Sequence, residues 1–133
     1  MVKKILILAV CSFIVKFTVA QQVDCRQFKE GKFRINDNRA GGVIIAERRG
    51  GFQTETMDVL KATVRFKITW QNDCSYTLTL DKVLRNDNKV PFPSNMKVSV
   101  KIIAVENNTS YTQQISSSLV KSSYKVEVLK TGN

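Results

Sequence analysis

The sequence has no histidine, two prolines and one tryptophan among its 133 residues. Without histidine, a histidine-based catalytic triad and the usual zinc-hydrolase helix are both excluded. Both prolines fall in residues 85–95, so that segment cannot be a central strand. Basic residues outnumber acidic ones by 21 to 11, but they are scattered, with no recognition-helix pattern and no aromatic pair. We therefore expect a solvated basic face and no specific nucleic-acid binding.

Long apolar runs are also scarce, and the one present lies near the start of the chain. Lys3 and Lys4 precede an apolar run over residues 5–15, and small residues follow at positions 18–20. This pattern predicts a secretory signal peptide at residues 1–20, and the run is too short for a membrane-spanning helix of about 20 apolar residues. A lipoprotein would be acylated at Cys11, but a small residue is expected before that cysteine and valine stands there. We expect a secreted or periplasmic protein without a transmembrane segment.

Two cysteines, Cys25 and Cys74, remain after the expected cleavage. An even pair in an exported protein predicts one disulfide, with two buried free thiols as the alternative. In the chain-entropy model, closing a loop of this length contributes about 4 kcal/mol to stability. Residues 21–133 are enough for one domain, and no linker or repeat divides them.

After the predicted signal peptide, apolar residues recur mainly at every second position rather than with the period of a helix. Apolar residues alternate with polar ones, which places them on one face of a strand and predicts a sheet with one buried side. The apolar members of these alternating runs are Val64, Phe66, Ile68 and Trp70; Tyr76, Leu78 and Leu80; Val98, Val100 and Ile102; and Tyr124, Val126 and Val128.

Turn residues separate these runs at short intervals. The separators lie at residues 36–42, 50–51, 58, 71–73 and 107–108, with one longer break at residues 85–95. About eight short strands joined mostly by hairpins predict an all-β antiparallel meander, either a closed barrel or a partly open one. A small Greek-key sandwich is the alternative. A barrel of eight strands has room for side chains or for one small ligand, so a filled core and a small apolar pocket both remain open.

One hairpin concentrates the polar chemistry. If Gly50 and Gly51 form a two-residue turn, Arg48 lies opposite Gln53, and Glu55 shares their face of the sheet. Both faces of this hairpin are partly apolar, so the pattern does not identify the inner one. The three side chains either form an exposed pair or a buried cluster that could orient the polar group of a ligand. Considered alone, the pattern favours the exposed arrangement.

The sequence offers few other candidates for catalytic or metal-binding residues. Glu47 and Glu55 could in principle act as acid and base, but any hairpin brings charged residues together. The aspartates in probable loops lack the spacing of a calcium-binding loop. The sequence therefore predicts no metal site, no cofactor and no catalytic residue.

Several short motifs occur in order along the mature chain. They are Cys25-Arg-Gln-Phe-Lys-Glu-Gly-Lys-Phe33, then Arg48 with Gln53 and Glu55, then Phe66-Lys-Ile-Thr-Trp70, Asp73-Cys74 and Tyr76-Thr-Leu78. In this combination the chain resembles a family of small exported β proteins of Bacteroidetes bacteria. The family pattern is cysteine, Phe-Lys-x-Gly-Lys-Phe, arginine, Gln-x-Glu and Trp-x-x-Asp-Cys-x-Tyr-x-Leu.

This resemblance implies export, a disulfide and a β fold, but no established activity. Members often carry the label DNA topoisomerase IV, and a chain this short lacks the ATP site and the catalytic tyrosine setting of such an enzyme. In the family pattern Arg48, Gln53 and Glu55 go together, which favours a shared role, in ligand binding or in a buried network that specifies the fold.

We therefore hypothesise an exported, non-enzymatic β-barrel, loosely lipocalin-like, that binds a small or lipidic molecule or a partner protein of unknown identity. Trp70 and Tyr76 would line its interior, and Arg48, Gln53 and Glu55 would form its polar end. The alternative is a surface interaction module with a filled core, using basic strand faces or the loop from 86 to 95. A carboxylate-based enzyme is the least favoured hypothesis.

Overall fold

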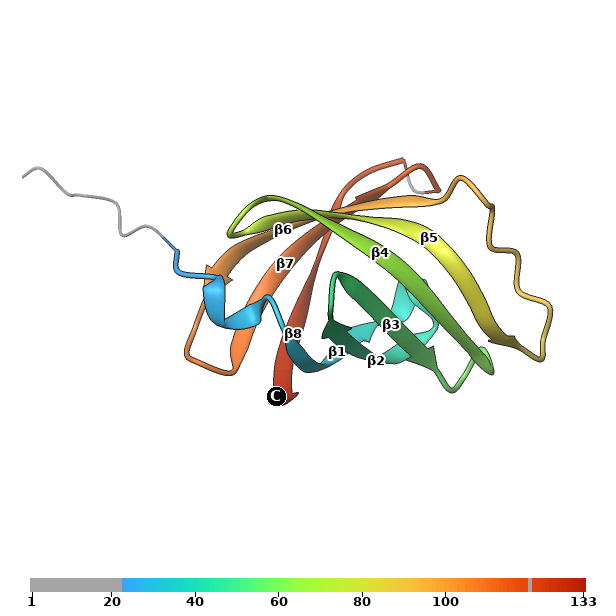
Figure 1. Cartoon of the computed structure of the whole chain (residues 1–133), viewed down its shortest axis with the longest axis horizontal. Coiled ribbons are helices and arrows are strands. Elements are labelled where there is room, and N and C mark those ends of the chain that lie inside the picture. Colours follow the sequence, from blue (N-terminus) through green and yellow to red (C-terminus); the bar gives the residue numbers. More distant parts are fainter. Residues whose placement is uncertain (1–22, 120) are drawn as a thin grey trace, which may run out of the picture.

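The computed structural model describes residues 23–119 and 121–133, so the predicted signal peptide lies outside the described residues. In these residues, eight antiparallel strands follow one another around a closed barrel, with each strand paired to its neighbours in sequence and β1 paired to β8 (Figure 1). The all-β meander expected from the sequence is thus confirmed. The strands are β1 (Gly31–Asp37), β2 (Gly42–Arg49), β3 (Phe52–Met57), β4 (Ala62–Asn72), β5 (Ser75–Asn86), β6 (Lys97–Val105), β7 (Ser110–Ser117) and β8 (Tyr124–Gly132).

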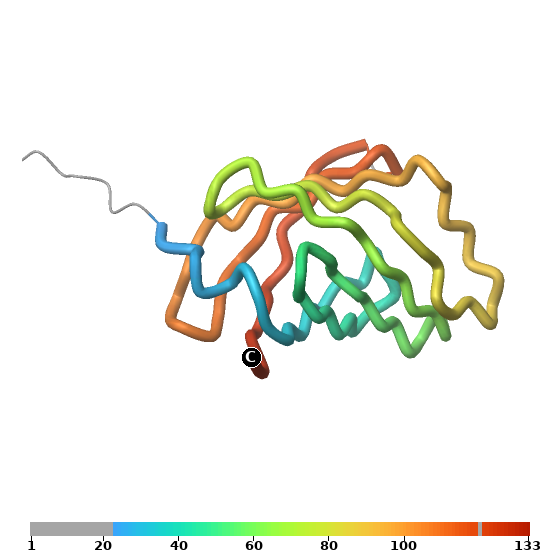
Figure 2. The backbone as a smooth tube through the Cα atoms, in the orientation of Figure 1, coloured from blue at the N-terminus to red at the C-terminus, as the bar shows by residue number. Residues whose placement is uncertain are grey.

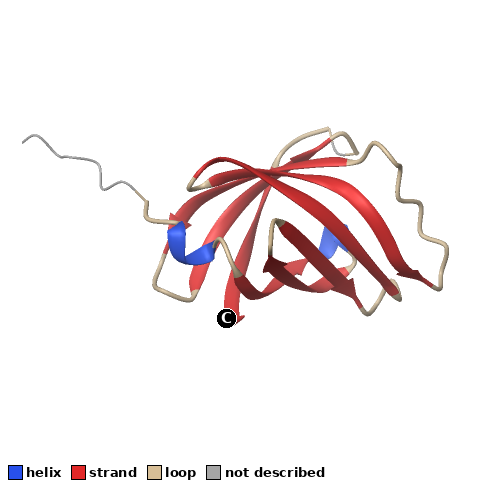
Figure 3. Ribbon diagram, viewed as in Figure 1, coloured by secondary structure: helices blue, strands red, loops and turns tan. Residues whose placement is uncertain are grey.

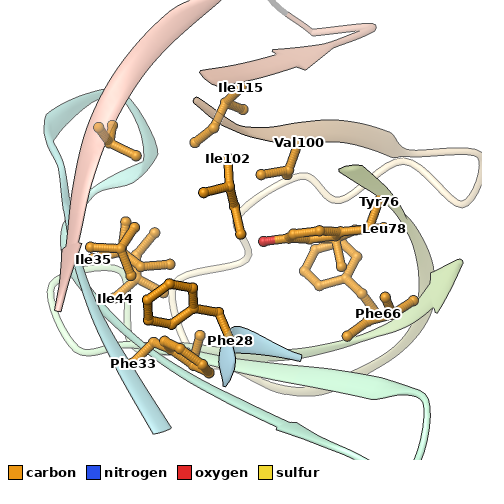
Figure 4. Close-up of a cluster of buried hydrophobic side chains, with 14 of the residues drawn as sticks. Phe28, Phe33, Ile35, Ile44, Phe66, Tyr76, Leu78, Val100, Ile102 and Ile115 are labelled. Carbon is orange, nitrogen blue, oxygen red and sulfur yellow. The ribbon is translucent and has the colours of Figure 1, made fainter. Parts of the chain in front are cut away.

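The core forms because inward and outward side chains alternate along the strands. In β1, every second residue from Gly31 to Asp37 is buried and the residues between them are exposed. Side chains from β1, β2, β4, β5, β6 and β7 point towards a common centre, and the ring of Tyr76 reaches far into it (Figure 4). The alternating runs predicted for β4, β5, β6 and β8 face this interior, although Trp70, Leu80, Val98 and Tyr124 are only partly buried.

Successive hairpins place alternate loops at opposite ends of the barrel. One end, which we call the closed end, carries the 3-10 turn η1 (Arg26–Phe28) and the turns β2–β3, β4–β5 and β6–β7. The open end carries the 3-10 turn η2 (Asn38–Ala40) and the loops β3–β4, β5–β6 and β7–β8. The two 3-10 turns accordingly lie far apart in the molecule (Figure 3).

A short plug, residues 25–28, covers the closed end. Cys25 and Cys74 form the expected disulfide, with their Cα atoms 5.2 Å apart, which ties the plug to the β4–β5 turn. Phe28 is completely buried, and its ring centroid lies 4.4 Å from that of Tyr111. The disulfide therefore holds the plug, with the ring of Phe28, across the closed end of the barrel.

The hairpin of β2 and β3 has the predicted register, with Arg48 opposite Gln53 and Ala46 opposite Glu55. Gly50 and Gly51 both have positive φ, 59° and 82°, as a tight type I′ turn requires. The exposed arrangement favoured by the pattern is wrong. Arg48 and Gln53 are each only 1% exposed and face the interior, while Val43, Ile45 and Phe52 lie on the outer face.

The longest connection in the barrel joins β5 to β6 and contains both prolines. β5 continues to Asn86, so the break begins slightly later than the sequence predicts and covers residues 87–96. This loop runs along one side of the molecule (Figure 2). Phe92 is partly buried and packs against the core, so the loop contributes to the open end of the barrel.

Candidate ligand-binding site

The interior of the barrel is not completely filled, because a cavity of about 540 Å³ extends from its centre to the open end. This volume is within the range of small-molecule sites, about 300–1,000 Å³. The walls are mostly apolar and come from strands around the barrel, chiefly Ile35, Ile44, Met57, Phe66, Leu78, Val98, Val100 and Ile115, with Met96 added from the β5–β6 loop. A cavity with such walls suits an apolar molecule, since burial of apolar surface drives association.

Loops of the open end form the mouth of the cavity. Leu60 comes from the β3–β4 loop, residues 90–92 from the β5–β6 loop and Leu119 from the β7–β8 loop. The turn η2 adds a fourth segment to the mouth. Every loop at this end thus contributes to the entrance, whereas none of the turns at the closed end does.

The turn η2 is fixed by a buried carboxylate. Oδ1 of Asp37 accepts hydrogen bonds from the backbone N–H groups of Arg39 and Ala40, at 3.0 and 3.3 Å. Its other oxygen, Oδ2, accepts one from the Tyr124 hydroxyl at 2.9 Å. Burial, followed by the bond to Asp37, raises the pKa of Tyr124 above its usual range. Both oxygens of Asp37 are thereby occupied in holding the mouth together.

Polar side chains form a patch within the otherwise apolar cavity. Gln53 and Glu55 project from β3, Tyr76 from β5 and Gln113 from β7, and all four line the cavity. Gln53, Tyr76 and Gln113 are at most 2% exposed. A few convergent polar groups in an apolar cavity are typical of sites that orient a ligand. We call these four residues the polar patch.

Arg48 lies beneath the polar patch and outside the cavity lining. Its Nε donates to Oε1 of Gln53 at 2.7 Å, Nη1 donates to the carbonyl oxygen of Phe28 at 2.8 Å, and Nη2 donates to the Tyr76 hydroxyl at 2.6 Å. These bonds join the plug, β2, β3 and β5. A buried guanidinium is costly to desolvate unless its donors are satisfied, and here three of them are.

Aromatic rings compensate further for the burial of this cation. The guanidinium carbon of Arg48 lies 4.2 Å from the ring centroid of Phe33 and 4.9 Å from that of Tyr76. Rings at such distances attract a cation through their quadrupoles. Burial raises the pKa of Tyr76, so its hydroxyl stays protonated and donates to Oε1 of Gln113 at 3.4 Å.

Glu55 is the acidic member of the polar patch. Its Oε1 accepts a hydrogen bond from Nε2 of Gln53 at 2.7 Å. Burial raises the pKa of the carboxyl above its usual range, although the bond from Gln53 and the charge of Arg48 act in the opposite direction. Within the part of the chain that the structure describes, its second oxygen, Oε2, accepts no side-chain hydrogen bond. That oxygen is free to receive a donor from a bound molecule.

The structure brings together most of the residues proposed from the sequence, but in three different roles. Gln53, Glu55 and Tyr76 line the cavity, whereas Arg48 supports them from behind. Trp70 lies at the closed end and does not line the cavity. Its ring centroid is 4.6 Å from that of Tyr76, and Nζ of Lys29 lies 5.2 Å from its ring centroid.

The two glutamates considered as an acid–base pair lie on opposite faces of the sheet. Glu47 is on the outer face, where it lies 3.6 Å from Arg49, while Glu55 faces the cavity. They therefore do not share a cleft. Among residues 23–119 and 121–133, no group of three or more potential ligands is placed to hold a metal ion.

Sequence reasoning missed two cavity residues and the plug. Gln113 alternates with the buried Tyr111 and Ile115, so its inward position could have been found from the period of β7. Asp37 was placed in a loop, but it ends β1 and caps η2. No local signal showed that Phe28 would close the barrel, because that position depends on the disulfide and on the barrel around it.

A second hollow, of about 790 Å³, lies beside the disulfide at the closed end. It is lined by exposed charged residues such as Asp24, Asp73 and Lys101. It also borders Val23, the first described residue. The cavity at the open end is the better candidate site because its walls are buried and apolar.

Comparisons with protein-family models, curated proteins and solved structures find no match to this chain. Within the described residues, the structure contains no helix with the length and apolar character needed to span a membrane.

Proposed function

We propose that this protein is an exported, non-enzymatic barrel that binds a small, largely apolar molecule in its open-end cavity. One observation carries the proposal: a cavity of about 540 Å³ has mostly apolar walls and a patch of convergent polar side chains, of which Gln53, Tyr76 and Gln113 are buried. Such an arrangement buries the apolar body of a ligand and orients its polar group. The Cys25–Cys74 disulfide is consistent with an extracellular or periplasmic location, and the sequence pattern of residues 1–20 supports export.

The first test is native mass spectrometry of the protein purified from its own host, before and after extraction with organic solvent. A mass excess that disappears on extraction is expected, and its value would identify the bound molecule. A mass equal to that of residues 21–133 less two hydrogens, with no excess at any stage, would argue against a carried ligand.

The second test fills the cavity with a side chain. Val98 lines the cavity and is only partly buried, so Val98→Trp places an indole in the ligand space without repacking the deepest part of the core. Binding of an apolar fluorescent probe should weaken about tenfold or more, which corresponds to about 1.4 kcal/mol or more. Ser99→Trp is the matched control, because Ser99 is the next residue on the strand and points outwards. Equal probe binding by the two variants would contradict the proposal.

A further inference from the structure

The charged side chains that line the cavity differ in how far their binding capacity is already used. Asp37 has both carboxylate oxygens occupied by η2 and Tyr124. Arg39 is exposed at the mouth, and its guanidinium carbon lies 4.6 Å from the ring centroid of Tyr124. Glu55 alone among these three combines a position in the polar patch with an oxygen that accepts no side-chain hydrogen bond from the described residues.

The network beneath the polar patch determines which kind of group Glu55 presents. Arg48 can only donate hydrogen bonds, so the oxygen of the Gln53 amide must face it. The amide nitrogen of Gln53 then points at Glu55, where it occupies one carboxylate oxygen. The second oxygen is left as an acceptor. Glu55 is thereby held as an oriented acceptor by a chain of bonds that begins at a buried arginine.

An anionic ligand fits this arrangement poorly. Within the part of the chain that the structure describes, Arg48 is the buried cation near the polar patch, but it lies behind Gln53 and Tyr76 and does not line the cavity. Among the described residues that line the cavity, the cation is Arg39, which is exposed at the mouth, so a ligand carboxylate at the patch would lie beside Glu55 instead. Two carboxylates so close together cannot both be ionised without repulsion. A cationic head group, in contrast, would bring a donor and an opposite charge to the free oxygen.

We propose that the ligand is an apolar amine, whose positively charged nitrogen binds Oε2 of Glu55 while its hydrocarbon body fills the cavity. This inference rests on the proposed function, since it specifies what kind of molecule the same cavity takes. An uncharged hydroxyl could donate a hydrogen bond to the same oxygen, but the amine adds the attraction of an opposite charge inside the cavity, so it should be distinguished from an uncharged molecule of the same shape.

The experiment compares three probes with the same tail, namely decylamine, decanol and decanoic acid, by isothermal titration calorimetry of the full exported chain at neutral pH. Decylamine should bind about tenfold or more tightly than decanol, and decanoic acid should bind most weakly. Glu55→Gln keeps an oxygen that can accept from Gln53 but removes the charge. This variant should bind decylamine no more tightly than decanol.

Glu47→Gln is the matched control, because it removes the same charge from the outer face of the neighbouring strand and should leave all three affinities unchanged. If none of the three probes binds, the proposed function fails and this inference fails with it. If decanol or decanoic acid binds as tightly as decylamine, the cavity does bind apolar molecules but the amine assignment is wrong. The probe series on the unaltered protein gives this answer even if the Glu55 variant does not fold.

Discussion

Arg48 and Glu55 bind opposite ends of the same side-chain amide. The Nε of Arg48 donates to Oε1 of Gln53 at 2.7 Å, and Nε2 of Gln53 donates to Oε1 of Glu55 at 2.7 Å. A buried cation and a cavity-facing carboxylate are therefore connected without touching, and the glutamine cannot flip without placing two donors face to face. The three side chains therefore form one hydrogen-bond network, in which the contribution of each to stability should depend on the other two.

Replacing the buried arginine should be strongly destabilising. Arg48→Ala removes three hydrogen bonds and leaves the acceptors on Gln53 and Phe28 without partners in the interior. We expect the free energy of unfolding to fall by about 3–5 kcal/mol, as measured by urea denaturation.

The neighbouring arginine supplies the control for that measurement. Arg49 is on the outer face, and its side chain is 69% exposed. Arg49→Ala should change the free energy of unfolding by about 0.5 kcal/mol or less. Equal losses in the two variants would show that the Arg48 network does not stabilise the fold in the way its geometry indicates.

The ligand-free protein should become less stable as the pH rises through the titration of Glu55. Burial raises the pKa of this carboxyl in the folded protein above its ordinary value of 4.5. Below the ordinary value the group is protonated in both states, so its favourable contribution is fully present. As the pH rises through the raised folded pKa, the unfolded state binds fewer protons than the folded one, and that contribution is lost.

Glu55→Gln isolates this effect, since it removes the titrating group. As the pH rises from about 4.5 to the raised pKa of the folded state, the free energy of unfolding of the variant should increase relative to that of the unaltered protein. Above that pKa the difference between the two proteins should stay constant. Urea denaturation over a series of pH values measures the difference. A stability difference that does not vary with pH would show that Glu55 is not the group responsible.

Removing the hydroxyl of Tyr111, unlike removing Arg48, should not lower the stability of the protein. This hydroxyl is buried, and among the described residues it has no hydrogen-bond partner. Removing an unsatisfied buried polar group should not be harmful, so Tyr111→Phe should leave the free energy of unfolding unchanged or raise it by about 1 kcal/mol. Thermal or urea unfolding measures this, with Tyr76→Phe as the comparison because the Tyr76 hydroxyl is bonded to Arg48. A clear loss of stability in Tyr111→Phe would mean that its hydroxyl has a partner.

The disulfide should make a large contribution to stability. Cys25 and Cys74 are 49 positions apart, and in the chain-entropy model opening this loop costs about 4 kcal/mol. The double replacement of both cysteines by serine should lower the free energy of unfolding by about that amount. Reduction of the unaltered protein should have the same effect. If reduction changes nothing, the bond is not a determinant of stability.

The fold could be predicted because its signals are local. Alternation over β4, β5, β6 and β8 places each run on one face, and the glycine pair at positions 50–51 sets the register of one hairpin. Closure of the sheet depends on the pairing of β1 with β8, which joins the two ends of the domain. No short-range pattern encodes that pairing, so the sequence left an open barrel and a sandwich as alternatives.

The inner face of the β2–β3 hairpin was missed for a different reason. Both faces carry apolar residues, and a hairpin considered alone has no core to choose between them. The choice is made by the next strand, where Gln53 pairs with Phe66 and Glu55 pairs with Val64. Paired residues share a face, and the alternation of β4 clearly turns Phe66 and Val64 inwards. Pairing β3 with β4 across the loop at residues 58–61 would have identified the buried cluster.

The uneven division of the barrel between its two ends has a consequence for how this scaffold can vary. The disulfide, the plug and the Arg48 network lie at or near the closed end, while the mouth of the cavity is built from the four connections of the open end. No residue from 87 to 96 takes part in the disulfide, the plug or the hydrogen bonds of Arg48, so changes to the exposed part of this loop should leave those interactions intact. If the proposed function holds, mutation of the open end, in nature or in the laboratory, would change which molecules the cavity takes while the closed end stays the same.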